Sequence, residues 1–194
     1  MPLEIKKTFK DGTTVPYGPI FDDIRKNYGF SDLRGRPDLA EEIFEGSSSS
    51  ALRGLLVRMA RERSYFSLGC DLGRHSEDEQ PQMRKRVSGG YIQVASMNYA
   101  EASTDQYDAF CEAFGKELRL HVGKQRWRIE LQGTYVQFNI PDELSVKAPS
   151  MWIWFFAVSR THEKSDQSRE ELLAAIGETL HVDHVRECLI CRAV

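Results

Sequence analysis

The apolar run Met151-Trp152-Ile153-Trp154-Phe155-Phe156-Ala157-Val158 decides the fold. Successive side chains of a strand point to opposite faces, so a run that is apolar at every position predicts a central strand covered on both sides. This run of eight residues is the longest of its kind in the chain, and it is too short to cross a membrane as a helix. We therefore expect a sheet built around residues 151–158 and no membrane-spanning helix.

Alternating apolar and polar residues predict two strands on the N-terminal side of this run. Phe66, Leu68, Cys70 and Leu72 recur at every second position, which predicts a strand with these side chains on one face. Residues 91–99 resume the pattern. The polar stretch between these strands is too long to be a tight hairpin turn.

The segment 126–140 carries two apolar sets in different phases. One straight strand would place the two sets on opposite faces of a sheet. A two-residue turn at Gly133-Thr134 would return both sets to one face, so the pattern predicts a β-hairpin. The apolar residues change from odd to even positions along the segment: Trp127, Ile129, Leu131, Val136, Phe138 and Ile140.

Three longer helices are predicted from caps and from apolar spacing. The serines at 47–50 offer an N-cap for a helix over 51–63. The capping-box patterns Ser103-x-x-Gln106 and Ser168-x-x-Glu171 predict the starts of two further helices. The residues expected to face the core follow helical spacing: Leu52, Leu55, Leu56, Met59, Tyr107, Phe110, Cys111, Phe114, Leu118, Leu172, Leu173, Ile176 and Leu180.

The N-terminal part reads as a hairpin followed by short helices. Asp11-Gly12 lies between two β-compatible segments within residues 3–17, and short helices are expected over 21–27 and 38–45. Together these patterns predict an α+β fold: a mixed, largely antiparallel sheet of about five strands, helices packed on it, and a β-hairpin and short helices before it. We expect residues 1–63 to form an N-terminal hairpin and helical segment and residues 64–194 the sheet domain, although both can belong to one domain.

Composition limits the classes of protein that fit. The chain has 194 residues, with 26 Lys and Arg against 29 Asp and Glu, and 41% of its residues are hydrophobic. This excludes collagen-like, mucin-like and wholly disordered chains, and it argues against a strongly basic domain. The N-terminus lacks the apolar segment of a secretory signal peptide. Its four cysteines are therefore expected to stay reduced, and the expected location is cytoplasmic.

A zinc site is one hypothesis for the C-terminal segment. Its histidines and cysteines are His181, His184, Cys188 and Cys191, and imidazole and thiolate are preferred zinc ligands. A straight helix would spread them over about 15 Å, too far for one ion, and a strand would point the two cysteines to opposite faces. We therefore expect no cofactor and keep zinc as an alternative.

Nucleic-acid binding is a second alternative. The middle of the chain is mildly basic, and the predicted hairpin carries cations beside tyrosine and amide side chains, which contact phosphates and stack on bases. The candidate residues are Arg84, Lys85, Arg86, Arg119, Lys124, Arg126, Arg128 and Tyr135.

Catalytic motifs are absent from the sequence. There is no nucleophile elbow and no glycine-rich phosphate loop. Cys70 and His75 would be the pair for a small thiol hydrolase, but Cys70 alternates with apolar residues expected in the core. We therefore expect a non-enzymatic protein-interaction or structural subunit of a larger, bacterial-type assembly or of a defence or effector system. Its partner would be another protein or a second copy of the chain.

Overall fold

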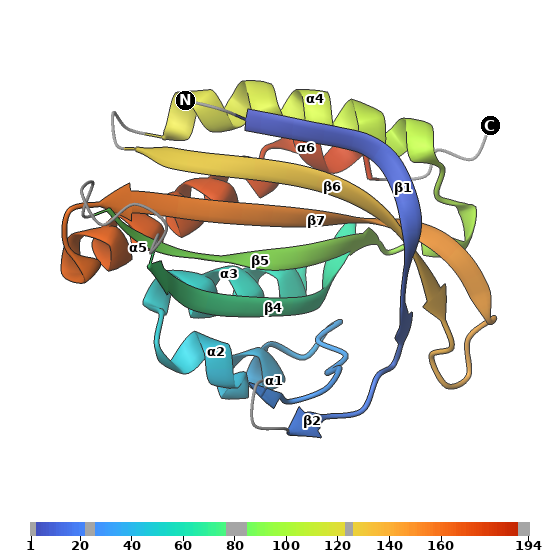
Figure 1. Ribbon diagram of the computed structural model, residues 1–194. Coiled ribbons are helices and arrows are strands. Elements are labelled where there is room, and N and C mark those ends of the chain that lie inside the picture. Colours follow the sequence, from blue (N-terminus) through green and yellow to red (C-terminus); the bar gives the residue numbers. More distant parts are fainter. Residues whose placement is uncertain (1–2, 22–25, 77–84, 123–125, 190–194) are drawn as a thin grey trace.

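The computed structural model describes residues 3–21, 26–76, 85–122 and 126–189. Its centre is a five-stranded sheet in the order β1-β6-β7-β5-β4, and β7 is the middle strand (Figure 1). β1 runs parallel to β6, and every other neighbouring pair is antiparallel. The predicted α+β fold is therefore confirmed, with residues 151–158 in the central strand. The strands are β1 (Leu3–Val15), β4 (Tyr65–Ser76), β5 (Arg86–Ser96), β6 (Trp127–Phe138) and β7 (Val146–Ser159).

Three helices pack on one face of the sheet: α3 (Ser50–Arg61), α4 (Thr104–His121) and α5 (His162–Leu180). The short helices α1 (Pro37–Glu42) and α2 (Phe44–Ser47) lie beside the outer edge of β4, close to the small hairpin of β2 (Ile20–Phe21) and β3 (Lys26–Asn27) (Figure 1). The 3₁₀ helix η1 (Tyr99–Glu101) and α6 (Asp183–Glu187) complete the described elements. None of the described helices is long and apolar enough to span a membrane.

The core under these helices matches the predicted apolar stripes. Every helical residue expected to face the core is buried, and the capping box of Ser103 and Gln106 is present at the start of α4. The predicted start of α5 is wrong. Thr161 caps this helix by accepting a hydrogen bond from the amide of Lys164. The helix therefore begins about two turns before the predicted cap, Ser168. The first turns of α5 are largely polar, so apolar spacing could not reveal them.

The predicted hairpin in residues 126–140 is wrong. β6 is one continuous strand that pairs with β7 from Trp127 opposite Ala157 to Phe138 opposite Val146. The two apolar sets do lie on opposite faces, because the sheet has a core on each side. Ile129 belongs to the core beneath the helices, whereas Phe138 belongs to a second core. The second core comprises Val15, Phe66, Leu68, Ala95, Tyr99, Val136, Phe138, Ile140 and Ala148.

The predicted coverage of the central strand on both faces is wrong for one face. Among the described residues, the helices cover only the side of Met151, Ile153 and Phe155. Trp152 and Trp154, on the other side, remain partly exposed and stack on each other, with ring centroids 5.3 Å apart. Each indole ring shields part of the other from solvent, and no described helix covers them.

The prediction for residues 66–72 also misplaces two side chains. Phe66 and Leu68 pack in the second core, whereas Cys70 and Leu72 pack against the first. The cause is a β-bulge between Ser67 and Gly69 that shifts the pairing with β5 by one residue. A bulge inserts one residue and so exchanges the two faces of the strand.

The N-terminal hairpin forms at a later position than Asp11-Gly12. β1 bends but continues through these residues, with irregular pairing on either side of Asp11, and Gly12 packs against β6 (Figure 1). A Cβ at Gly12 would lie 2.5 Å from Thr134 Oγ1. The hairpin is formed instead by β2 and β3, where a short helix was expected. β1 thus joins the main sheet and α3 joins the main core, so the described part of residues 1–63 shares both with the rest of the described chain.

Candidate functional site

A large cavity lies at the outer edge of β4. Its volume is about 740 Å³, and its walls come from β4, from α1 and α2, and from the segment that includes β3 and residues 28–31. Ligand pockets in proteins commonly have volumes of about 300–1,000 Å³. We call this space the edge cavity.

The bulge in β4 positions one wall of the edge cavity. Because the bulge removes Leu68 from the ladder with β5, its carbonyl accepts a hydrogen bond from the Tyr17 hydroxyl at 3.2 Å. Gly69 leaves the room that this hydroxyl needs, since a Cβ there would lie 2.8 Å from it. Tyr17 is thereby held against the sheet, close to Tyr91 of β5.

The lining of the edge cavity includes four aromatic rings and three carboxylates. The aromatic residues are Tyr17, Tyr28, Phe44 and Tyr91, and the acidic residues are Glu42, Glu45 and Asp71. No Lys, Arg or His occurs among its described lining residues. The cavity therefore combines negative charge with the electron-rich faces of aromatic rings.

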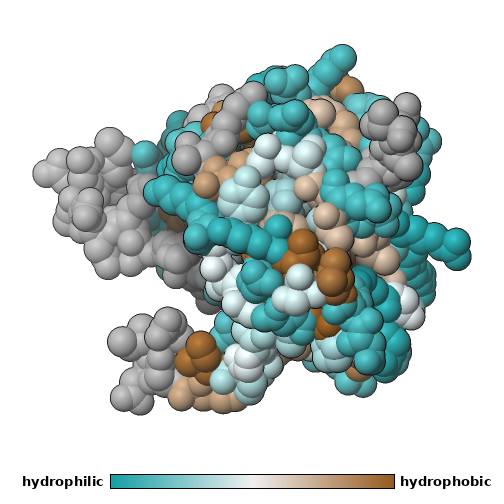
Figure 2. Space-filling model, turned by 90° about the vertical axis from the view of Figure 1, so that its right-hand side faces the viewer, coloured by the Kyte–Doolittle hydropathy of each residue, from teal (hydrophilic) through white to brown (hydrophobic). Residues whose placement is uncertain are grey.

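The mouth of the edge cavity is bordered by exposed apolar side chains. Tyr28 packs on Phe44, with ring centroids 4.6 Å apart, and its edge contacts Phe21 at 5.4 Å. Ile20 precedes Phe21 in β2. In Figure 2 the hairpin of β2 and β3 projects as a lobe at lower left, with hydrophobic residues on it, from a surface that is largely hydrophilic. We call Ile20, Phe21, Tyr28 and Phe44 the apolar rim.

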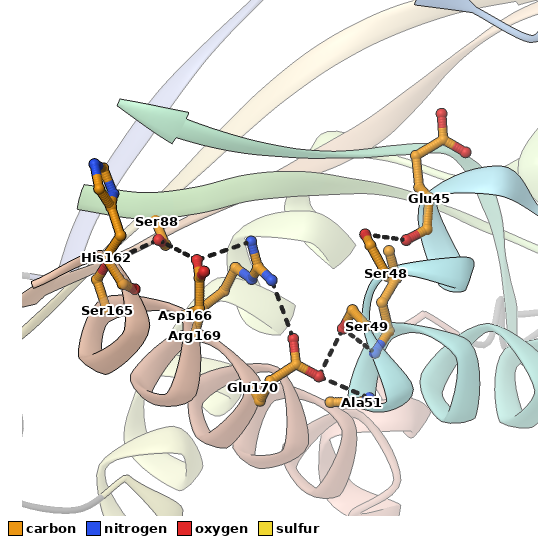
Figure 3. Close-up of polar contacts among 11 residues, drawn as sticks. Glu45, Ser48, Ser49, Ala51, Ser88, His162, Ser165, Asp166, Arg169 and Glu170 are labelled. Atoms are coloured by element: carbon orange, nitrogen blue, oxygen red, sulfur yellow. Dashed lines mark hydrogen bonds and ion pairs between the residues drawn. The ribbon is translucent and has the colours of Figure 1, made fainter. Parts of the chain in front are cut away.

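The electrostatics of the edge cavity follow from partial burial beside negative charge. Burial raises the pKa of Glu45, and the charge of Asp71 raises it further. Burial also raises the pKa of Tyr17 to about 12, with smaller contributions from Cys70 and Glu45. The carboxylate of Glu45 accepts a hydrogen bond from its own backbone amide and makes no other hydrogen bond or ion pair with the described residues. In Figure 3 it points away from the serines that follow it.

Cys70 lies in the wall of the edge cavity as a free thiol. Burial raises its pKa, and the charges of Glu45 and Asp71 raise it further. A nucleophilic cysteine needs positive surroundings that stabilise the thiolate, so this environment is the reverse of a catalytic one. His75 lies five residues farther along β4, about 16 Å from Cys70 in an extended strand. The structure therefore does not bring the pair together.

A largely buried polar network joins β5 to α5 (Figure 3). Ser88 of β5 donates a hydrogen bond of 2.5 Å to Asp166 and lies 2.9 Å from the Ser165 hydroxyl, both on α5. The ring of His162 points away from these hydroxyls in Figure 3, and its Nδ1 is buried without a partner among the described residues. Among the described residues of this network, no serine hydroxyl bonds to a histidine ring, and the hydrogen bonds of Ser88 join β5 to α5.

The basic residues predicted to contact nucleic acid are dispersed. Lys85, Arg86 and Arg126 come to one end of the sheet, on either side of the last residues of β7. Arg128 faces away from the helices, where it pairs with Glu4 and Glu130 at 3.0 Å. Two residues lie elsewhere: Arg119 is exposed on α4, and Tyr135 packs on Phe9 on the opposite face of β6 from Arg128. Arg84 and Lys124 lie outside the described residues.

The three described residues of the predicted zinc site have other partners. His181 Nδ1 lies 2.9 Å from the carbonyl of Gly177, and His184 Nε2 lies 3.4 Å from Glu117. Cys188 donates to the carbonyl of His184. The described residues contain no group of three or more His, Cys, Asp or Glu side chains able to hold a metal ion. Cys191 lies outside the described residues.

Comparison of the chain with protein-family models, with curated proteins and with solved structures finds no match in any of the three. The edge cavity and the apolar rim are therefore the candidate functional features of this protein. Neither feature was expected from the sequence. Their residues come from segments far apart in the chain, and the only local signal was the placing of aromatic residues in a polar N-terminal segment.

Proposed function

We propose that this protein is a non-enzymatic protein-interaction module that binds a partner protein through the apolar rim. One observation carries the proposal. Of the six large hydrophobic residues exposed in the described part of the chain, three contact one another in this rim: Phe21 is 63% exposed, Tyr28 43% and Phe44 57%. A fourth, Ile20, is 47% exposed and precedes Phe21 in β2. Clustered exposed aromatic residues are typical of surfaces that a partner buries.

The small size of the hairpin supports the same proposal. β2 and β3 have two residues each, and a hairpin this short is at most marginally stable in water by itself. Exposing Phe21 on it costs free energy that a partner surface would recover, at roughly 25 cal/mol for each Å² of apolar area buried. The β2–β3 hairpin is thus better suited to contact a partner protein than to stabilise the fold.

The chemistry of the edge cavity favours binding over catalysis. Burial, together with the nearby carboxylates, raises the pKa of Cys70 and keeps it in the thiol form, which is a poor nucleophile. Cys70 and Cys188 are free thiols, which fits a cytoplasmic subunit of a larger assembly. Nucleic-acid binding ranks below this reading, because Arg128 is paired with carboxylates and Tyr135 lies on the other face of β6.

The apolar rim can be tested by a matched pair of double variants. F21S/F44S removes two rim side chains, whereas L120S/L144S removes two leucines that are 75% exposed elsewhere on the surface. We expect the wild-type protein to purify from native extract with a partner in a fixed molar ratio. F21S/F44S should lose that partner and L120S/L144S should keep it, with both measured by quantitative mass spectrometry.

Two results would contradict the interaction module. One is a wild-type protein that purifies as a monomer without a stoichiometric partner. The other is equal loss of the partner from both double variants, since this would show that the rim has no special role. Circular dichroism of each variant confirms that the comparison is made between folded proteins.

A further inference from the structure

The edge cavity has the chemistry of a site for an organic cation. Its carboxylates, Glu42, Glu45 and Asp71, have no described basic lining residue to balance them. Aromatic rings attract cations placed over their faces, and the attraction grows as the cation is desolvated. Negative charge and ring faces thus favour the same kind of ligand.

We propose that the edge cavity binds the guanidinium group of an arginine side chain that the partner protein inserts past the apolar rim. This assignment rests on the proposed function, because the rim supplies the contact that delivers the side chain. It adds the chemical identity of the group that enters. The apolar rim would bind the residues that flank the arginine.

The position of the carboxylates favours a guanidinium over a metal ion. Asp71 comes from β4 and Glu45 from α2, on different walls of the cavity. Within the described residues, these carboxylates do not converge into a group that could coordinate a metal. A planar guanidinium has five donors directed outward, so it can pair with carboxylates on separate walls.

The aromatic walls favour arginine over lysine. A guanidinium stacks flat on tyrosine and phenylalanine rings, whereas an ammonium is a compact and strongly hydrated charge. Tyr17 and Tyr91 lie on the sheet side of the cavity, and Tyr28 and Phe44 lie on the opposite side. The volume of about 740 Å³ also leaves room for backbone on either side of the inserted residue.

The cation can be tested on the isolated protein with three short peptides. These are acetyl-Gly-Arg-Gly-amide, its lysine counterpart, and its citrulline counterpart, which has nearly the shape of arginine without its charge. Binding is followed by tryptophan fluorescence, because the Tyr91 ring lies 4.5 Å from Trp152 and 4.9 Å from Trp154. Calorimetry provides the dissociation constants independently of this signal.

We expect the arginine peptide to bind about tenfold or more tightly than the citrulline peptide, with the lysine peptide between them. E45Q and D71N should each weaken arginine binding by about tenfold and leave citrulline binding unchanged. E41Q is the matched control, because Glu41 is an exposed residue of α1 outside the cavity lining. Thermal unfolding shows that each of these isosteric variants is folded.

Several outcomes would overturn the guanidinium site. They are equal affinity for the arginine and citrulline peptides, tighter binding of lysine than of arginine, no saturable binding of the arginine peptide, or equal effects of E45Q and E41Q. The peptides test the cavity without a partner, whereas F21S/F44S tests the rim with one. Failure of the cation assignment is therefore distinguishable from failure of the interaction module.

Discussion

Gly69 is the residue that allows the edge cavity to have its tyrosine wall. It follows the bulged residue Leu68, whose carbonyl has left the ladder with β5 and accepts the Tyr17 hydroxyl instead. A side chain at Gly69 would compete with this hydroxyl for the same space. The absence of a side chain at Gly69 thus allows Tyr17 to bond to the bulge and form the wall of the cavity.

This link predicts that substitutions at Gly69 and Tyr17 are not additive. G69A places a Cβ 2.8 Å from Tyr17 Oη but 4.0 Å from Cζ, so the clash is with the hydroxyl alone. We expect Y17F and G69A each to lower the free energy of unfolding by about 1 kcal/mol, the value of one hydrogen bond. The double variant should cost about as much as one single variant, because the hydroxyl is lost only once.

Urea unfolding of the four proteins measures this coupling. If the costs of the two single variants simply add in the double variant, the contact between Gly69 and the Tyr17 hydroxyl does not determine the stability of this region. The same proteins can be tested with the arginine peptide. G69A should weaken its binding, since Tyr17 moves away from the sheet.

At the scale of elements, sequence patterns predict the helices better than the strands. The predicted core-facing residues of α3 and α4 are correct because each of these helices has only one apolar face to bury. The hairpin prediction for β6 is wrong because one core would require both apolar sets on one face, whereas the two sets face two cores. β4 was misread because a bulge exchanges its faces, and a bulge depends on pairing with β5 that lies outside the local sequence.

A buried network joins the central sheet to the wall of the edge cavity. Arg169 of α5 lies between Asp166 and Glu170, at 3.6 Å and 3.3 Å. Glu170 in turn accepts hydrogen bonds from the Ser49 hydroxyl and the Ala51 amide at the start of α3 (Figure 3). This start follows α2 directly, so the network holds the helix that carries Glu45.

Arg169→Leu should therefore be much more destabilising than Arg58→Leu. Arg169 is only 7% exposed, and removing it takes the compensating charge from two carboxylates, which we expect to cost about 3 kcal/mol. Arg58 also joins α3 to α5, through Glu178, but this pair lies at the surface and should contribute at most about 1 kcal/mol. Chemical denaturation of both variants provides the comparison, and similar losses would show that the network adds no stability.

At the scale of the whole molecule, the site was not predictable because it forms only where distant segments of the chain meet. The edge cavity lies where the chain between β1 and α2 passes along the edge of β4. Tyr17, Glu45 and Asp71 are brought together only by this passage. Each looks like an ordinary surface residue in the sequence. Sequence reasoning favoured a protein-interaction role by excluding catalytic motifs, but it could not indicate the surface.

One ionic cluster joins the segment between β1 and α2 to the residues that follow β6, beside the second core. Arg34 pairs with Asp32 at 2.5 Å and with Glu143, after β6, at 2.6 Å. Its guanidinium also lies 4.8 Å from the centre of the Phe66 ring. Tyr99 donates a further hydrogen bond of 2.5 Å to Glu143. The cluster therefore connects segments more than 100 residues apart around the second core.

The cluster predicts a pH dependence of stability that Arg34 controls. Burial raises the pKa of Asp32, but the hydrogen bonds and charge of Arg34 outweigh it and hold this pKa below its ordinary value. The hydrogen bond from Arg34 lowers the pKa of Glu143 in the same way. Carboxyl groups whose pKa is lower in the folded state stabilise the protein above their unfolded pKa of about 4, and this contribution is lost as the pH falls through the folded values.

Arg34→Gln should therefore cost most at neutral pH, about 1 to 2 kcal/mol after allowance for partial exposure. The difference from the wild type should shrink as the pH falls below about 4, where both carboxyl groups become protonated in either protein. Arg36→Gln is the control, because its pair with Asp38 is exposed to solvent and should change stability little at any pH. Urea unfolding at several pH values tests the prediction, and a cost of Arg34→Gln that stays constant from pH 7 to pH 3 would mean that Arg34 acts through packing on Phe66 rather than through its charge.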